Sequence, residues 1–201
     1  EVPNCVITDW PEFSIRGFLQ DIGRAYLPIE EIKAEIDNLA RFKVSVFHWH
    51  LTENEAWRLQ SDIFPQLNSP ESMTRDIGKF YTKAQAREIV DYASERGMMV
   101  VPEFDMPGHS KAFVRALGFD MQSQEGIDAL KKLLSEMSDT FGPKVTTFHI
   151  GTDETPFTNP DFVPQILAHV RSLGKKVWAW NPGWKFKPGE LDAIHLWSYR
   201  G

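Results

Sequence analysis

Short apolar runs alternate with amphipathic stretches along the whole chain. The runs are rich in Val, Ile, Phe and Trp, as buried parallel strands are, and they occupy residues 14–21, 44–51, 98–104, 147–150, 176–180 and 193–197. Between them, apolar residues recur at helical spacing and predict helices that begin near Pro28, Thr82, Ile127 and Asp161. Thr82 with Gln85 forms a capping-box pattern, and Gly97 marks the end of that helix. This alternation predicts a parallel sheet covered by helices.

Two folds share this alternation, and the polar residues after the strands distinguish them. A doubly wound sheet usually has a glycine-rich phosphate-binding turn, which the sequence lacks. A TIM-type (β/α)8 barrel collects residues from many strand ends at one mouth, and polar clusters follow all the apolar runs. The predicted fold class is therefore α/β, a TIM-type barrel with about six βα units out of the usual eight. We expect residues 1–201 to form one domain that is incomplete at its C-terminal end.

Composition limits the kinds of partner. The net charge is -6 and no run of Lys or Arg is present, so nucleic acid is not an expected partner. No apolar stretch is long enough for a membrane span. Cys5 is the only cysteine, which leaves no intramolecular disulfide.

Residues 147–154 organise the predicted site. An apolar run breaks at Gly151 and places two adjacent carboxylates, Asp153 and Glu154, where a buried strand should end. Adjacent acids repel each other and are rarely buried without partners, so the pair either serves chemistry or lies in a solvated loop. Because polar clusters also follow the other strands, we favour an active site. Arg16, in the first apolar run, is either half of a structural ion pair or a ligand clamp.

The tryptophans fall into two predicted groups. Trp180 and Trp197 end their strands and are expected to line a pocket, whereas Trp49 and Trp178 are interpreted as core residues of the outer face. His149 is interpreted as a hydrogen-bonded core histidine.

Four motifs occur in order on successive predicted strands. They are Arg16-Gly17, His48-Trp49-His50-Leu51-Thr52 with Trp57-Arg58, Pro102-Glu103-Phe104-Asp105-Met106-Pro107-Gly108-His109-Ser110, and Gly151-Thr152-Asp153-Glu154. Together they resemble glycoside hydrolase family 20, the β-N-acetylhexosaminidases, over nearly the whole chain. The resemblance implies a (β/α)8 barrel without a cofactor that releases terminal β-linked N-acetylglucosamine or N-acetylgalactosamine from glycans with retention. It also implies a secreted or periplasmic protein, with the cytoplasm left open.

The resemblance assigns roles to individual residues. Glu154 matches the acid-base, and Asp153 matches the residue that orients the substrate's acetamido group. Arg16 matches an arginine that binds sugar hydroxyls, and His109 matches a histidine beside the acid. Trp180 and Trp197 match aromatic walls of the N-acetyl pocket. Three residues are expected to support this site, namely Glu53, His50 and Asp105.

The sequence departs from the family pattern in three respects. Glu53 stands where the family commonly has Asp, one methylene shorter, and Thr152 replaces a frequent glycine. The family's seventh and eighth strands supply a Tyr, a Trp and an acid, and we find no positions for them in the sequence.

The chemistry also follows from the acid pair itself. Ordinary retaining glycosidases place two carboxyls about 5 Å apart across the sugar, whereas neighbouring residues on one strand point to opposite faces. A substrate acetamido oxygen that attacks the anomeric carbon removes the need for a second carboxylate nucleophile. We expect burial and the charge of Asp153 to keep Glu154 protonated, and Asp153 to stay ionised beside donors.

Two rival readings differ in class from this enzyme. A metal-dependent barrel hydrolase would use His48, His50, His109 and Asp153, with His195, as ligands. A non-catalytic glycan-binding protein, or an inactive fragment on the same scaffold, would fit the missing strands. Contacts within a homo-oligomer could stabilise such a chain.

Overall fold

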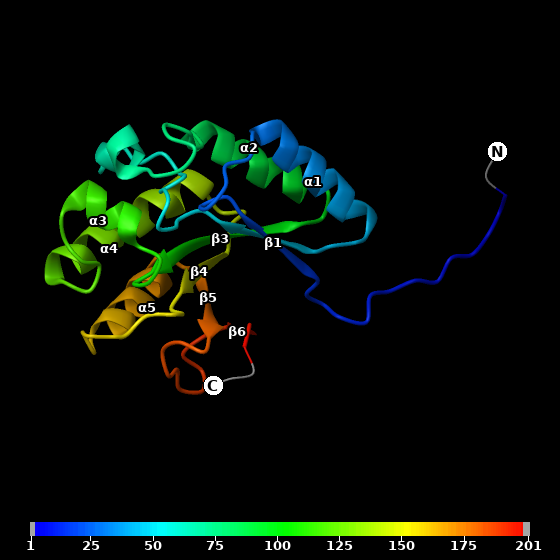
Figure 1. Cartoon of the computed structure of the whole chain (residues 1–201). Coiled ribbons are helices and arrows are strands. Elements are labelled where there is room, and N and C mark those ends of the chain that lie inside the picture. Colours follow the sequence, from blue (N-terminus) through cyan, green and yellow to red (C-terminus); the bar gives the residue numbers. More distant parts are fainter. Residues whose placement is uncertain (1–2, 199–201) are drawn as a thin grey trace.

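The computed structural model describes residues 3–198 as a curved sheet with helices along its outer side (Figure 1). Six parallel strands follow one another in sequence order. They are β1 Gly17–Asp21, β2 Val46–His50, β3 Met99–Met106, β4 Thr147–Gly151, β5 Lys176–Asn181 and β6 Ala193–Leu196. This confirms the six predicted parallel strands, and the architecture is a partial (β/α)8 barrel, although no helix follows β5 or β6 within the described residues.

Helices occupy most of the connections between the strands. They are α1 Ile29–Arg41, α2 Lys83–Ser94, α3 Lys111–Leu117, α4 Gln124–Phe141 and α5 Phe162–Ser172, with 3-10 turns η1 Pro65–Asn68 and η2 Pro70–Ser72 in the long loop after β2. The predicted capping box at Thr82 and Gln85 is present, with both reciprocal bonds formed. Asp161 precedes α5, but its side chain makes no capping bond. None of the helices described between residues 3 and 198 is long and apolar enough to cross a bilayer.

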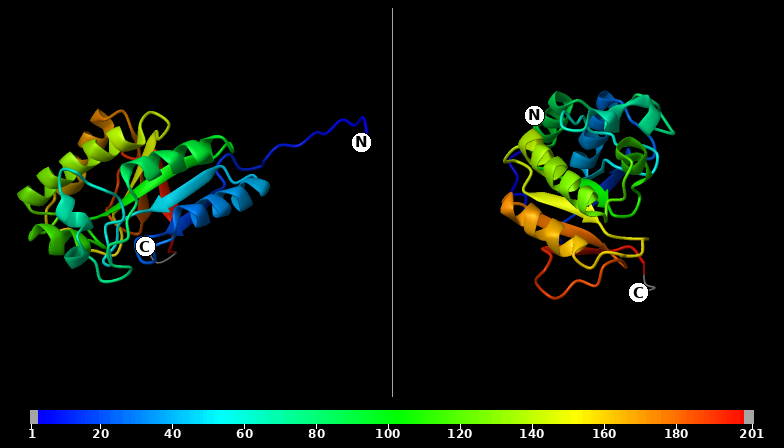
Figure 2. Two further views of the ribbon diagram at one scale, coloured as in Figure 1. Left: turned by 90° about the horizontal axis from the view of Figure 1, so that it is seen from above. Right: turned by 90° about the vertical axis from the view of Figure 1, so that its left-hand side faces the viewer.

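The main hydrophobic core lies between the helices and the outer face of the sheet (Figure 2). Phe47 and Trp49 of β2, and Phe148 of β4, are fully buried in this layer against apolar faces of α1, α2 and α4. Burial of each such side chain contributes roughly 1.5–3 kcal/mol. The expected core position of Trp49 is confirmed.

The prediction that Trp178 lies on the outer face of the sheet is wrong. Trp178 packs with Val46 and Val101 on the inner face of the sheet, away from the helices. Side chains two residues apart on a strand share a face, so Trp178 shares the inner face with Trp180. Both line a pocket of about 260 Å³ on this face, between β1 and β5.

Candidate active site

Charged residues gather at the carboxyl ends of the strands, where active sites of parallel barrels form. Asp153 and Glu154 follow β4, His109 follows β3 and Glu53 follows β2. Arg24 follows β1 and joins the same group through Glu53. The structure therefore brings four of the predicted site residues together.

The loop after β4 has an unusual backbone that separates the two acids. Gly151, Thr152 and Glu154 have φ angles of 67°, 84° and 52°. Positive φ is easy for glycine but strained for a β-branched residue, so Thr152 in place of a glycine stores strain here. Asp153 pairs with Gly183 in an isolated antiparallel bridge, which holds this loop against the loop after β5. Because β4 ends at Gly151, the alternation of a strand does not govern the directions of Asp153 and Glu154.

A chain of contacts runs from Glu154 into the protein. Nε2 of His109 lies 3.3 Å from Oε2 of Glu154 and 3.9 Å from Oδ2 of Asp153. On its other side, Nδ1 of His109 is paired with Oε1 of the buried Glu53. Nη2 of Arg24 donates to the same Oε1 atom at 2.7 Å. Although Glu53 is one methylene longer than the commonly found aspartate, it reaches His109.

This arrangement favours a protonated His109. The hydrogen bond that His109 donates to Glu53 raises the pKa of His109 to about 9, with burial opposing the shift and the charges of Asp105 and Asp153 adding to it. Glu53 behaves in the opposite sense, because its bonds to His109 and to the backbone N–H of Asn54 outweigh burial and lower its pKa. The pair is therefore an ion pair at neutral pH.

We expect the ring signals of His109 to titrate with a midpoint near pH 9, well above the ordinary value of 6.5. Because the folded-state pKa is raised, the resulting stabilisation is complete below about pH 6.5 and is lost as pH rises through about 9. NMR titration of the ring protons measures the midpoint, and unfolding at several pH values measures the stability. Glu53→Gln should lower the midpoint, whereas Glu95→Gln, at the exposed end of α2, should not. A midpoint at or below 6.5 in the unsubstituted chain would contradict the ion pair.

The two acids differ from their predicted environments. The side chain of Glu154 is 52% exposed, whereas a buried acid was expected. Asp153 is the more buried of the two, at 14% exposed, and burial raises its pKa despite opposing contacts with a backbone N–H and His109. Asp105 is buried behind them, and burial together with the charges of Glu103 and Asp153 raises its pKa well above the usual range.

Arg16 lies apart from this group, at the amino end of β1. The guanidinium of Arg16 donates to the carbonyl oxygens of Phe13 and Lys43, at 2.5 Å and 2.7 Å, near the amino end of β1. Trp197 lies just beyond β6 with 47% of its side chain exposed. The cation that reaches the acids is Arg24, which the sequence analysis did not select. Its signal was its position just past Asp21, where both the predicted strand and β1 end.

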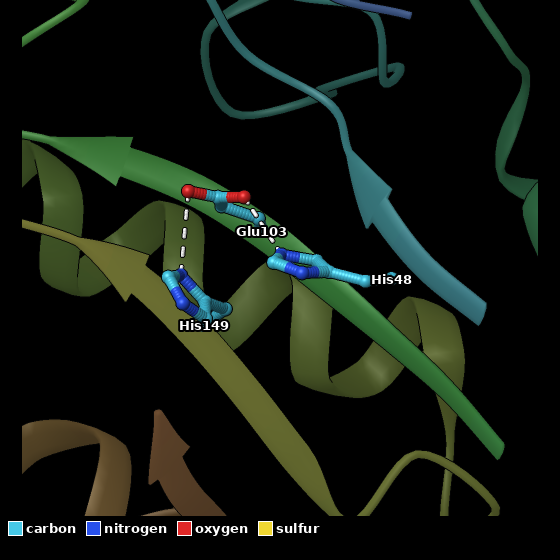
Figure 3. A group of neighbouring side chains, drawn as sticks. All are labelled: His48, Glu103 and His149. Atoms are coloured by element: carbon cyan, nitrogen blue, oxygen red, sulfur yellow. Dashed lines mark ion pairs between the residues drawn. The ribbon is translucent and has the colours of Figure 1, made fainter. Parts of the chain in front are cut away.

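A second cluster lies on the inner face of the sheet, and we call its five residues the Glu103 cluster. It consists of Glu103 with His48, His50, His149 and Trp180, of which Figure 3 shows three. His149 is fully buried, and its Nδ1 accepts the N–H of Gly151 at 3.1 Å, as expected for a core histidine. His50, predicted to support the site, contacts Glu103 rather than His109.

The histidines and acids proposed as metal ligands fall into different groups, two of which share Asp105. Among the described residues, His48 and His50 each lie with Glu103, whereas His109 and Asp153 lie with Asp105. The ligand set of the metal-dependent rival is therefore not brought to one point.

Comparisons with known proteins agree with this geometry. Residues 13–125 match the model of the family described as glycosyl hydrolase family 20, catalytic domain. A β-hexosaminidase of Porphyromonas gingivalis is 39% identical over 180 residues, covering 77% of this chain and 23% of that protein. A β-hexosaminidase of Vibrio furnissii is 42% identical over 130 residues, covering 58% of this chain and 21% of that protein.

Solved structures show the same fold. A chitobiase of Flavobacterium johnsoniae superposes with a TM-score of 0.82 at 28% identity, covering 96% of this chain and 35% of that chain. The sequence thus spans between a fifth and about a third of the lengths of these three relatives.

Proposed function

The chain belongs to glycosyl hydrolase family 20, and we propose that it forms part of the catalytic barrel of a retaining β-N-acetylhexosaminidase. Its substrate would be a glycan with a terminal β-linked N-acetylglucosamine or N-acetylgalactosamine. The observation that carries the proposal is the contact chain from Glu154 through His109 to Glu53, beside Asp153, at the carboxyl ends of the strands. Relatives named β-hexosaminidase support the substrate class.

The proposed reaction has two steps, and the substrate supplies the nucleophile. In the first, the acetamido oxygen forms a bond to the anomeric carbon while Glu154 gives its proton to the departing glycosidic oxygen. Asp153 accepts the acetamide N–H and offsets the positive charge of the resulting oxazolinium ion. In the second, water attacks the anomeric carbon, Glu154 takes a proton from that water, and the oxazoline ring opens. Two inversions give retention.

His109 has a distinct part in this scheme. After the first step Glu154 is a carboxylate, and a protonated His109 at 3.3 Å stabilises that charge. Glu53 in turn keeps His109 protonated and oriented. The side chain of Glu154 is exposed, as expected for an acid that must reach the leaving group at the open end of the barrel.

We propose Arg24 rather than Arg16 as the cation that binds sugar hydroxyls. Arg24 is half exposed beside the acids and is held by Asp21 at 2.6 Å and Glu53 at 2.7 Å. A planar guanidinium fixed in this way retains donors for hydroxyl groups. Arg16, by contrast, is engaged with carbonyl oxygens at the other end of β1.

Hydrolysis of nitrophenyl β-glycosides tests the proposal. We expect release from the N-acetylglucosamine or N-acetylgalactosamine derivative and none from the glucose derivative, because glucose lacks the acetamido nucleophile. Equal release from glucose would contradict the mechanism. Binding of N-acetylglucosamine without any release would instead support a glycan-binding protein on this scaffold.

A further inference from the structure

The proposed reaction does not use Glu103, although this residue has an unusual environment. Its carboxylate is completely buried on the inner face of β3 and contacts side chains from three other strands, of which His48 and His149 are drawn in Figure 3. Oε2 lies 2.7 Å from Nε2 of His48 and 2.9 Å from Nδ1 of His50. Oε1 accepts the indole N–H of Trp180 at 2.6 Å and lies 3.3 Å from Nδ1 of His149. An ionised carboxylate buried in this way requires such partners.

The charges within the Glu103 cluster are assigned by its contacts. Burial opposes a charge on His50, but Glu103 outweighs it and raises the pKa of His50 to about 10. Burial lowers the pKa of His149 to about 4, so this ring is neutral at pH 7. Burial also opposes ionisation of Glu103, yet the positive charge of His50 and the bond to His48 hold its pKa well below the usual range. Glu103 is therefore an anion, and its bond to Trp180 is charge-assisted.

Trp180 needs an anchor of this kind. It is only half buried, on β5, and one side of its strand adjoins the short, partly exposed β6. Its ring contacts are the imidazoles of His48, His149 and His195, with centroids 4.7–5.4 Å away. Ring contacts permit several tilts of an indole, whereas a short N–H···O bond fixes one direction.

We propose that Glu103 is a positioning residue that fixes the orientation of Trp180 and thereby sets which N-acyl groups the sugar pocket accepts. This rests on the proposed function and on the family resemblance, which implies that Trp180 is a wall of the N-acetyl pocket. An anchored indole gives a wall that admits an acetyl group and excludes longer acyl chains. Without this hydrogen bond the indole can rotate, and the pocket then accepts longer acyl chains.

A metal ion among His48, Glu103 and His149 is the competing explanation, since their ligand atoms lie within 4.8 Å of one another. Two contacts favour the hydrogen-bonded arrangement. Trp180 already occupies Oε1 of Glu103, and the N–H of Gly151 already occupies Nδ1 of His149. A cation bound through those atoms would displace both donors.

NMR of the indole N–H groups tests the anchoring without any need for turnover. In the unsubstituted chain, we expect the Trp180 indole proton, assigned with Trp180→Phe, to be shifted far downfield and protected from exchange. Glu103→Gln should move it upfield and speed its exchange about tenfold or more, as expected when a charge-assisted hydrogen bond is lost. The control is Glu136→Gln, which changes a buried glutamate of α4 bonded to Ser61 and Lys83. It should leave the Trp180 signal in place.

Three results would overturn the anchoring. One is an unprotected Trp180 indole in the unsubstituted chain, which needs no variant to fold. Another is an unchanged Trp180 signal in folded Glu103→Gln. The third is a stoichiometric shift of this signal by Zn²⁺ that disappears in His149→Ala, which would establish a metal site instead.

The selectivity is tested with nitrophenyl glycosides of N-acetyl- and N-propionyl-glucosamine. Glu103→Gln should lower the kcat/KM preference for acetyl about tenfold, the usual discrimination for one methylene. Trp180→Phe should give the same change, and it provides the test if Glu103→Gln does not fold. The double variant should show no further change in preference. An unchanged preference alongside a moved Trp180 signal would refute the pocket role. Absence of turnover in the unsubstituted chain would count against the proposed function, while the indole signals would still decide the anchoring.

Discussion

Replacement of Glu154 by glutamine is expected to lower kcat for hydrolysis of an N-acetylglucosaminide with a poor leaving group by about 10²–10⁴-fold. An amide has nearly the shape of a carboxylic acid, but it cannot give a proton to the departing oxygen. The loss should be smaller for a nitrophenyl leaving group, which departs as a stabilised anion and needs less protonation. The measurement is kcat for a methyl glycoside and a nitrophenyl glycoside in the same preparation.

The structure indicates that Glu154→Gln removes few contacts. Glu154 is half exposed, and its one close charged contact among the described residues is with His109. The unfolding midpoint should therefore change little. Glu125→Gln, in the exposed first turn of α4, removes the same charge outside the proposed site and should leave both rates unchanged. Near-normal turnover of the methyl glycoside by Glu154→Gln would refute the role of Glu154.

Replacement of Gly151 by alanine is expected to destabilise the fold by about 3 kcal/mol or more. A Cβ atom at this position would lie 1.7 Å from Oδ1 and 2.5 Å from Cγ of Asp105. Asp105 is buried and its own Cα would be only 3.0 Å away, so a simple rotation of its side chain cannot relieve the overlap. The φ angle of 67° adds strain of roughly 1–2 kcal/mol for any residue with a Cβ atom.

A second glycine separates these two contributions. Gly174 has a φ of 73°, but a Cβ atom there would have no neighbour within 4 Å. Gly174→Ala should therefore show the backbone strain alone, roughly 1–2 kcal/mol. Urea unfolding measures both variants. In a double-mutant cycle, Asp105→Ala should recover much of the loss caused by Gly151→Ala, and equal losses at Gly151 and Gly174 would contradict the steric argument.

Periodicity predicted the strands and most of the helices because each element spans several repeats of its pattern. The seven-residue α3 was missed, since it is too short to show a helical period beside the loop that precedes it. Trp178 was placed on the outer face even though the two-residue period of a strand requires it to share a face with Trp180. This error came from applying the pattern to single residues instead of to the whole strand.

The site was predicted less completely than the fold, for physical reasons. Motifs identified Glu154, Asp153, His109 and Glu53, and the structure places them together. Arg16 was expected inside the first strand but precedes β1, because sequence fixes the beginning of a strand only to within a few residues. The exposure of an acid depends on loop dihedrals, and the contacts of Glu103 depend on the register of several strands.

The order of the strands also bears on how the chain folds during synthesis. Each strand pairs with the strand that precedes it in sequence, from β1 through β6. No described strand has to wait for a partner made much later, and each connection joins two neighbouring strands of the sheet. The sheet can therefore lengthen one strand at a time as the polypeptide leaves the ribosome. The loop that carries the two acids after β4 gains its bridge only when β5 has been made and Gly183 meets Asp153.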